Sequence, residues 1–274
     1  MRLTNAIKKI IQWRNEKEIV AIEHIVSSDK QFEGKVALII GGTGGIGYAI
    51  AKSLIESGCR VIIAGTNKNK IEEIVKEFGN QAKGCYINMN NIQDFNSNIK
   101  YSVDLFGKID ILINSAGVHT DNLNFWDLTD TEYDRVMNIN LRGPYFFSIE
   151  IARYMIENNI KGHILFVSSS RGAEPAWSPY GISKWGINGM VKGLAHMLIS
   201  NGIVVNGIAP GISATALIGM RDGDSIYTDE NVVGRMVLPN EVAAVAKTLV
   251  GSSGDMIVGD IVHISGGRGV IDIR

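Results

Sequence analysis

Residues 36–48, VALIIGGTGGIGY, decide the fold. The apolar run Val36–Ile40 passes directly into a glycine-rich turn, and Tyr48–Glu56 has the pattern of a helix. Glycines let backbone amides come close to a pyrophosphate, and a helix N-terminus adds oriented N–H donors and partial positive charge. This strand–turn–helix order predicts a dinucleotide-phosphate site. Its candidate residues are Gly41, Thr43, Gly44, Gly45, Ile46 and Gly47.

Six further apolar runs follow the first, each four to seven residues long and separated by stretches of helical pattern. Such runs are typical of parallel strands that are buried on both faces. The sequence therefore predicts an α/β chain with one Rossmann-type domain, a doubly wound, seven-stranded parallel sheet with helices on both faces. The six runs are Val61–Ala64, Gly84–Ile87, Ile109–Asn114, His163–Ser168, Ile203–Ala209 and Ile261–Ile264.

Composition agrees with one large domain and excludes several classes of protein. The 274 residues are 45% hydrophobic and 20% charged, which is enough for a full core. A net charge of −1 argues against a nucleic-acid partner. Cys59 and Cys85 have no metal-ligand spacing, so we expect buried thiols and no metal. No apolar run reaches the ~18 residues of a membrane span, and no signal-peptide pattern begins the chain, so we expect a cytoplasmic protein.

Residues 1–33 form a separate N-terminal extension. Ile7, Ile10 and Ile11, and later Ile19 and Ile22, recur at helical spacing among mixed charges. We expect one or two amphipathic helices, followed by a polar linker over 27–33. We expect the extension to pack on its own domain or on a partner; the alternative is that it lies on a membrane surface, which its acidic residues make less favourable.

The end of the second predicted strand bears on which dinucleotide binds. An acidic residue about 20 positions after the glycine turn would bind the ribose 2′-hydroxyl of NAD. Here the sequence reads Gly65-Thr66-Asn67-Lys68, with no carboxylate to repel a 2′-phosphate. Thr66 and Asn67 could donate to that phosphate, so NADP is favoured, with NAD as the alternative. Both residues could instead simply cap the next helix.

A tyrosine and a lysine four residues apart form the candidate proton-transfer pair. Tyr180 and Lys184 would share one face of a helix. A nearby ammonium favours phenolate and lowers the pKa of a tyrosine, which could then exchange a proton with a carbonyl or alcohol. The serine run 168–170 precedes them at a strand end, where ligands of such sheets bind.

Together these motifs resemble the short-chain dehydrogenase/reductase family, in the branch that includes 3-oxoacyl-acyl-carrier-protein reductases. The resemblance runs from about Gly34 to Gly267. The family's glycine loop, T-G-x-x-x-G-x-G, appears here with Ile40 in place of the threonine. That change bears on the stability of the loop more than on the chemistry.

The resemblance implies a catalytic tetrad. Asn140 matches the asparagine, in preference to Asn138, and Ser169 matches the serine, in preference to Ser168 and Ser170. Tyr180 would exchange the proton, and Ser169 would orient the substrate oxygen. Lys184 would bind the nicotinamide ribose and lower the pKa of the tyrosine, and Asn140 would hold a water on the proton path.

The resemblance also implies further cofactor contacts. A motif after the fourth strand borders the adenosine ribose, a pair after the third strand lies beside adenine, and the stretch after the sixth strand surrounds the nicotinamide. In this sequence they are Asn114, Ala116 and Gly117; Asn88 and Met89; and Pro210, Gly211, Ser213 and Thr215.

The substrate remains open in the sequence. We expect a substrate loop from about Ala214 to Leu238, and a small-molecule ketone or secondary alcohol, including 3-oxoacyl thioesters. His119, Trp126, Trp177 and Arg171 are candidates to border the cleft, with ordinary packing or surface placement as the alternative. A sugar or polyol dehydrogenase, or an NAD(P)-binding regulator without turnover, are the alternative functions.

The family usually forms dimers or tetramers, so a homodimer or homotetramer is expected here. Its long helices would be Tyr145–Asn158 and Gly181–Ser200.

Overall fold

The computed structural model describes residues 30–271, apart from 121–123, 216–218 and 221–222. The helices expected within residues 1–26 lie outside the described residues. Of the linker expected at 27–33, the described part forms a turn in which Phe32 is buried, and its N–H donates to Ser57 O at 3.0 Å. The end of this segment therefore belongs to the core of the domain.

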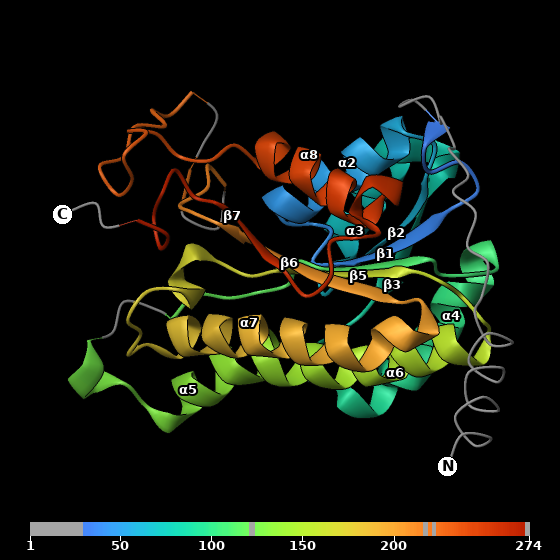
Figure 1. Ribbon diagram of the computed structural model, residues 1–274, viewed down its shortest axis with the longest axis horizontal. Helices are drawn as coiled ribbons and strands as arrows, with labels where there is room; N and C mark the ends of the chain where they lie inside the picture. The colour runs from blue at the N-terminus through green and yellow to red at the C-terminus, as the bar shows by residue number, and fades with distance from the viewer. Residues whose placement is uncertain (1–29, 121–123, 216–218, 221–222, 272–274) are drawn as a thin grey trace, which may run out of the picture.

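The predicted sheet is confirmed: seven strands, all parallel, lie in the order β3-β2-β1-β4-β5-β6-β7 (Figure 1). All five residues of β1 are buried, because helices cover both of its faces. The strands are β1 Val36–Ile40, β2 Arg60–Gly65, β3 Ala82–Tyr86, β4 Ile111–Asn114, β5 His163–Val167, β6 Val204–Pro210 and β7 Ile261–Ile264.

Helices form a layer on each face of the sheet (Figure 1). One layer contains α2 Gly45–Glu56, α3 Lys68–Phe78 and α8 Pro239–Val250. The other contains α4 Phe95–Phe106, α6 Gly143–Glu157 and α7 Pro179–Leu198, and α5 Asp130–Met137 leads into it. None of the helices within the described ranges is long and apolar enough to cross a membrane.

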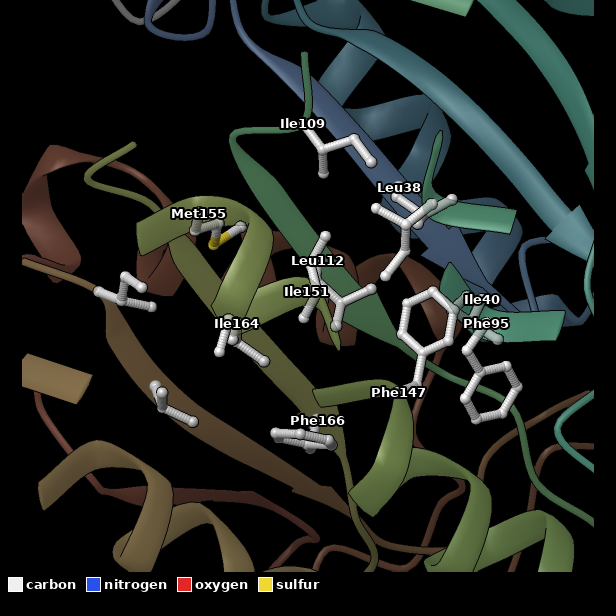
Figure 2. Packing of buried hydrophobic residues seen from close by; sticks show 14 of the residues in the cluster. Leu38, Ile40, Phe95, Ile109, Leu112, Phe147, Ile151, Met155, Ile164 and Phe166 are labelled. Carbon is white, nitrogen blue, oxygen red and sulfur yellow. The ribbon is translucent and has the colours of Figure 1, made fainter. Parts of the chain in front are cut away.

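Alternate residues of each central strand point into two separate cores. Leu38 and Ile40 face the layer of α4, α6 and α7, whereas Ala37 and Ile39 face that of α2 and α8. Figure 2 shows the first core, where Phe147 meets Phe95 edge-on, with ring centroids 5.1 Å apart. Burial on this scale is the main free-energy gain of folding, and it fixes the relative positions of the strand ends.

The strand order indicates where a ligand site would lie. β1 pairs with β2 on one side and with β4 on the other, so the connections after β1 and β4 leave the sheet in opposite directions. Ligands of open α/β sheets bind in the crevice at such a switch point, outside the carboxyl ends of the strands.

Candidate active site

The glycine turn after β1 is held tightly enough that side chains would not fit. Gly41 has a φ of +76°, and a Cβ there would lie 2.6 Å from Ala116 N. A Cβ at Gly47 would lie 2.3 Å from Gly41 O, and one at Gly45 would lie 2.9 Å from Thr215 Cγ2. Glycine at these positions allows helix α2 to pack closely on the turn, with its N-terminal residues Gly45 and Ile46 lining the crevice.

A cleft of about 320 Å³ opens above this turn. It runs along the ends of β1, β2 and β4 as far as Tyr180, and the charged residue among those lining it is Lys184. The predicted cofactor residues on its walls are Gly41, Thr43, Gly44, Gly45, Ile46, Thr66, Asn88, Met89, Ala116, Gly117, Tyr180, Lys184 and Thr215. Close-packed glycines and an absence of carboxylates among these lining residues suit a phosphate-bearing dinucleotide.

The residues at the end of β2 behave differently from one another. Thr66 lines the cleft. The side chain of Asn67 caps helix α3, accepting from Lys70 N at 3.1 Å. The ammonium of Lys68 lies 5.4 Å from the centre of the Tyr86 ring. The capping alternative therefore describes Asn67, and Thr66 is the member of this group that faces the ligand space.

Two other asparagines predicted to contact the cofactor, Asn114 and Asn88, accept hydrogen bonds from nearby backbone N–H groups. Asn114 is buried, and its Oδ1 accepts from Ala116 N at 3.3 Å, which shapes the turn after β4. Asn88 lines the cleft, while its Oδ1 accepts from Asn90 N at 3.0 Å.

Tyr180 and Lys184 lie one turn apart at the start of α7. The Ser178 hydroxyl caps this helix by accepting from Gly181 N at 3.2 Å, and Tyr180 N donates to Thr120 Oγ1 at 3.2 Å. The Lys184 side chain is buried, and its Nζ donates to Val167 O at 3.0 Å. That ammonium is 5.6 Å from the centre of the Tyr180 ring.

Hydrogen bonds distinguish the three neighbouring serines. Ser168 Oγ donates to Asn188 Oδ1 at 2.6 Å, so this hydroxyl turns into helix α7. The hydroxyl of Ser169 is hydrogen-bonded to Tyr180 and also accepts from Arg171 N at 3.2 Å. Ser169 is thus the serine that the structure brings to the phenol.

Asn140 lies in a π-helical turn over Asn138–Arg142, and its side chain is occupied by the protein. Its Oδ1 accepts from Val118 N at 2.8 Å, and its Nδ2 donates to Val118 O at 2.9 Å and Ser183 Oγ at 3.3 Å. A Cβ at Gly117 would lie 3.5 Å from that Oδ1 and 3.6 Å from Lys184 Nζ. The amide therefore ties the segment after β4 to α7, close to the lysine.

The expected depression of the Tyr180 pKa by Lys184 is not what the structure shows. Burial raises the pKa of Tyr180 above 10, and the opposing effects come from the Ser169 hydrogen bond and the charge of Arg171. Burial also lowers the pKa of Lys184, from 10.5 to about 8. Removal from water disfavours both the phenolate of Tyr180 and the ammonium of Lys184. This effect is larger than any stabilisation of the phenolate by Lys184, whose ammonium is directed at Val167 O.

A second cavity, of about 220 Å³, adjoins the cleft at Tyr180. Its walls bring together the serine loop, the last residue of β6, Pro210, and the stretch after it, including Gly211, Ser213 and Thr215. Two of the candidates to border the cleft, His119 and Arg171, line this cavity, and both also line a third cavity of about 280 Å³, where Trp177 lies. Trp126 lines none of these three cavities and is 87% exposed.

Sequence reasoning missed a charged cluster at the second cavity, which Arg268 and Glu230 line. Arg268 is only 13% exposed, and its Nε donates to Glu174 Oε1 at 2.7 Å. Its guanidinium also pairs with Glu230, a residue of the predicted substrate loop. Arg268 thus joins the substrate loop, the loop after β5 and the C-terminal segment. The glycines at 266–267 mark a turn, but no sequence pattern predicts that Arg268 pairs with Glu174, which lies 94 positions earlier.

Replacing Arg268 with Met should loosen the substrate loop. The substitution removes the partner of Glu230 described above and leaves Glu174 with its ion pair to Arg171, a costly change around the largely buried Arg268. We expect KM for the carbonyl substrate to rise about tenfold, with cofactor affinity unchanged. Steady-state kinetics and cofactor titration measure both. Arg153→Met, which removes an exposed pair with Glu150, is the matched control; equal effects of the two variants would contradict this role.

Known proteins resemble this chain over most of its length. The family model described as short chain dehydrogenase matches residues 35–224. A 3-oxoacyl-(acyl-carrier-protein) reductase of Vibrio harveyi is 33% identical over 239 residues, covering 86% of this chain and 97% of the relative. Dehydrogenase/reductase SDR family member 4 of Caenorhabditis elegans is 28% identical over 254 residues, covering 88% and 97%.

Solved structures agree with these relatives. A 3-ketoacyl-(acyl-carrier-protein) reductase from Brucella melitensis, complexed with NADH, has a TM-score of 0.79 and 29% identity, and covers 87% of this chain and 99% of its own. An actinorhodin polyketide ketoreductase with NADPH has a TM-score of 0.78 and 26% identity, covering 90% and 100%. With its parallel sheet, glycine turn and Tyr180–Lys184 pair, the chain belongs to the short-chain dehydrogenase family and is an NAD(P)-dependent oxidoreductase.

Proposed function

We propose that this protein uses NADPH to reduce the ketone of a 3-oxoacyl thioester to a secondary alcohol. The observation that supports it best is the meeting of Ser169, Tyr180 and Lys184 where the long cleft joins the second cavity. A dinucleotide along the glycine turn would bring its reactive ring to this junction. The 3-oxoacyl-(acyl-carrier-protein) reductases among the relatives support the choice of substrate class.

The side chains divide the chemistry among them. The bound dinucleotide supplies the hydride. The Ser169 hydroxyl orients the ketone oxygen, and the Tyr180 hydroxyl gives that oxygen its proton as negative charge develops on it. A raised pKa keeps the phenol protonated at neutral pH, as a proton donor requires. Lys184, whose Nζ donates to Val167 O, would hold the nicotinamide ribose and assist the return of a proton to the phenol.

A carboxylate at position 66 tests the cofactor preference. Thr66 faces the cleft at the end of β2, where an acidic side chain would accept from a ribose 2′-hydroxyl and repel a 2′-phosphate. We expect Thr66→Asp to raise KM for NADPH about tenfold or more and to improve the use of NADH. Thr131→Asp, on exposed α5, is the control. If the native protein binds NADH far more tightly than NADPH, this proposal is wrong.

A panel of carbonyl compounds tests the substrate class. NADPH oxidation should be fastest with acetoacetyl thioesters and slower with simple ketones and keto-sugars. Fast turnover of a keto-sugar and none of a thioester would overturn the substrate assignment while leaving the reaction type intact.

We also propose that the protein assembles through α6 and α7. Both helices expose large apolar side chains, namely Tyr145, Phe146, Ile182 and Trp185. Burying these side chains against a second copy would remove a large apolar area from water. Sedimentation velocity would give the mass of the assembly, and a monomer at micromolar concentration would contradict this arrangement.

A further inference from the structure

His119 lies against the phenol that is proposed to move the proton. Its imidazole stacks on the Tyr180 ring, with centroids 4.2 Å apart and an interplanar angle of 25°. The two residues come from different elements, because His119 follows β4 and Tyr180 opens α7. The contact is therefore tertiary and does not follow from the spacing of neighbouring residues on one helix.

Contacts on either side hold this stack in place. The backbone oxygen of His119 accepts from Arg135 Nη2 at 2.8 Å, and the same guanidinium is paired with Glu132. The next residue, Thr120, accepts from Tyr180 N at 3.2 Å. The loop and the start of α7 are thus joined next to the stacked rings, and the backbone that carries the imidazole is fixed relative to Tyr180.

The imidazole also separates two spaces. His119 and Tyr180 both line the second cavity, beside Ser169, and both line the third cavity, beside Trp177. On one side lies the junction where the ketone is proposed to react, and on the other lies the cavity lined by Trp177. A side chain in this position covers one face of the phenol and limits the access of water to it.

We propose that His119 is a positioning residue for the reaction proposed above: its ring covers one face of the Tyr180 phenol, holds the hydroxyl toward Ser169 and keeps water away from it. The proposal rests on the proposed function, because it assigns His119 a task in that proton transfer. It differs from a substrate contact, since His119 acts through Tyr180.

The charges around the stack favour a neutral imidazole. Lys184 comes from α7 and Arg171 from the loop after β5, and both lower the pKa of His119, in addition to the larger effect of burial. Arg268 and Glu230, which pair with each other, line the same cavity from the C-terminal segment and the substrate loop. At neutral pH the ring is therefore an uncharged aromatic cover, and a phenylalanine should replace it in this task.

The test compares His119→Phe with His119→Ala. Removing the ring admits water to the phenol and stabilises the phenolate, so His119→Ala should lower the pKa of Tyr180 by about one unit. The acid limb of the pH profile for oxidation of the alcohol product should move down by the same amount, and kcat on the plateau above that limb should fall about tenfold, because the hydroxyl is no longer held toward Ser169. His119→Phe should keep the wild-type profile, because it restores the cover without a titrating nitrogen.

Three outcomes would overturn the proposal. These are a wild-type pH profile in His119→Ala, a uniform loss of kcat at every pH, or a profile of His119→Phe that matches that of the alanine variant. Thermal unfolding and NADPH titration show whether each variant is folded. If His119→Ala is not folded, the comparison of His119→Phe with His119→Gln, a polar side chain without a ring, replaces it.

A readout without turnover separates this proposal from the proposed function. The phenolate of Tyr180 can be titrated by ultraviolet difference absorbance, with Tyr180→Phe as the blank. If no ketone is reduced but this titration shifts in His119→Ala and not in His119→Phe, the proposed function fails and the stacking role stands. If ketones are reduced and the titration does not shift, the stacking role fails alone.

Discussion

Tyr180→Phe is expected to lower turnover about 10³-fold, within the range that a positioned general acid contributes. The substitution removes one oxygen atom, the one bonded to Ser169, and keeps the aromatic ring that stacks on His119. The packing at the start of α7 should therefore survive. NADPH affinity should stay within a factor of about two, because Tyr180 is one of many residues along the cleft.

Single-turnover NADPH oxidation and NADPH titration of the same preparation measure this effect. Tyr101→Phe, which removes a phenol hydroxyl from exposed α4, is the matched control and should behave as wild type. A Tyr180→Phe variant that keeps a tenth or more of its turnover would mean that the proton comes from another group. A native protein that binds NADPH but reduces no carbonyl would point to the nucleotide-binding regulator instead.

The sheet could be predicted from sequence because its signal is local. Most of the seven apolar runs are rich in Ile and Val, and the structure has a strand within one or two residues of each run. Burial on both faces leaves no polar alternation to confuse the pattern, as all five buried residues of β1 illustrate. The glycine turn is local too, since backbone approach at Gly41 and Gly47 requires glycine whatever lies nearby.

Contacts between distant segments could not be predicted in the same way. The pairing of Arg268 with Glu174 and Glu230 depends on how two loops and the C-terminal segment meet above the sheet. Asn67 was ambiguous because an asparagine after a strand can cap a helix or face a ligand, and only the contact with Lys70 N decides. The tyrosine–lysine spacing predicted proximity, but the degree of burial, which sets the direction of both pKa shifts, is a property of the whole fold.

Lys184→Met is expected to abolish most of the activity and at the same time to stabilise the folded protein at neutral pH. Burial lowers the pKa of Lys184 from 10.5 to about 8. Below pH 8 both the folded and the unfolded chain hold the proton, so the folded state bears the full cost of a buried ammonium. That cost is about 3 kcal/mol, because each pKa unit corresponds to roughly 1.4 kcal/mol.

Methionine has a similar length and no charge, so the substitution removes this cost while filling the same space. It also leaves Val167 O without the Lys184 donor, and the lost hydrogen bond lowers the free energy of unfolding by about 1 kcal/mol. The net gain of about 2 kcal/mol should raise Tm by roughly 4–8 °C for a domain of this size. Turnover should fall about 10²-fold or more, because the ammonium next to the phenol is gone. Lys192→Met, on the exposed side of α7, is the control and should change neither quantity.

The pH dependence of this gain tests its cause. Between pH 8 and 10.5 the unfolded chain binds a proton that the folded chain has released, so the native protein gains stability as the pH rises. The methionine variant has no such proton, and its advantage over the native protein should shrink steadily across that window. Denaturant unfolding at pH 7, 9 and 10 would show the two curves converging. A constant difference would mean that packing, and not the buried charge, separates the two proteins, and a less stable variant at pH 7 would contradict the burial of a charged lysine altogether.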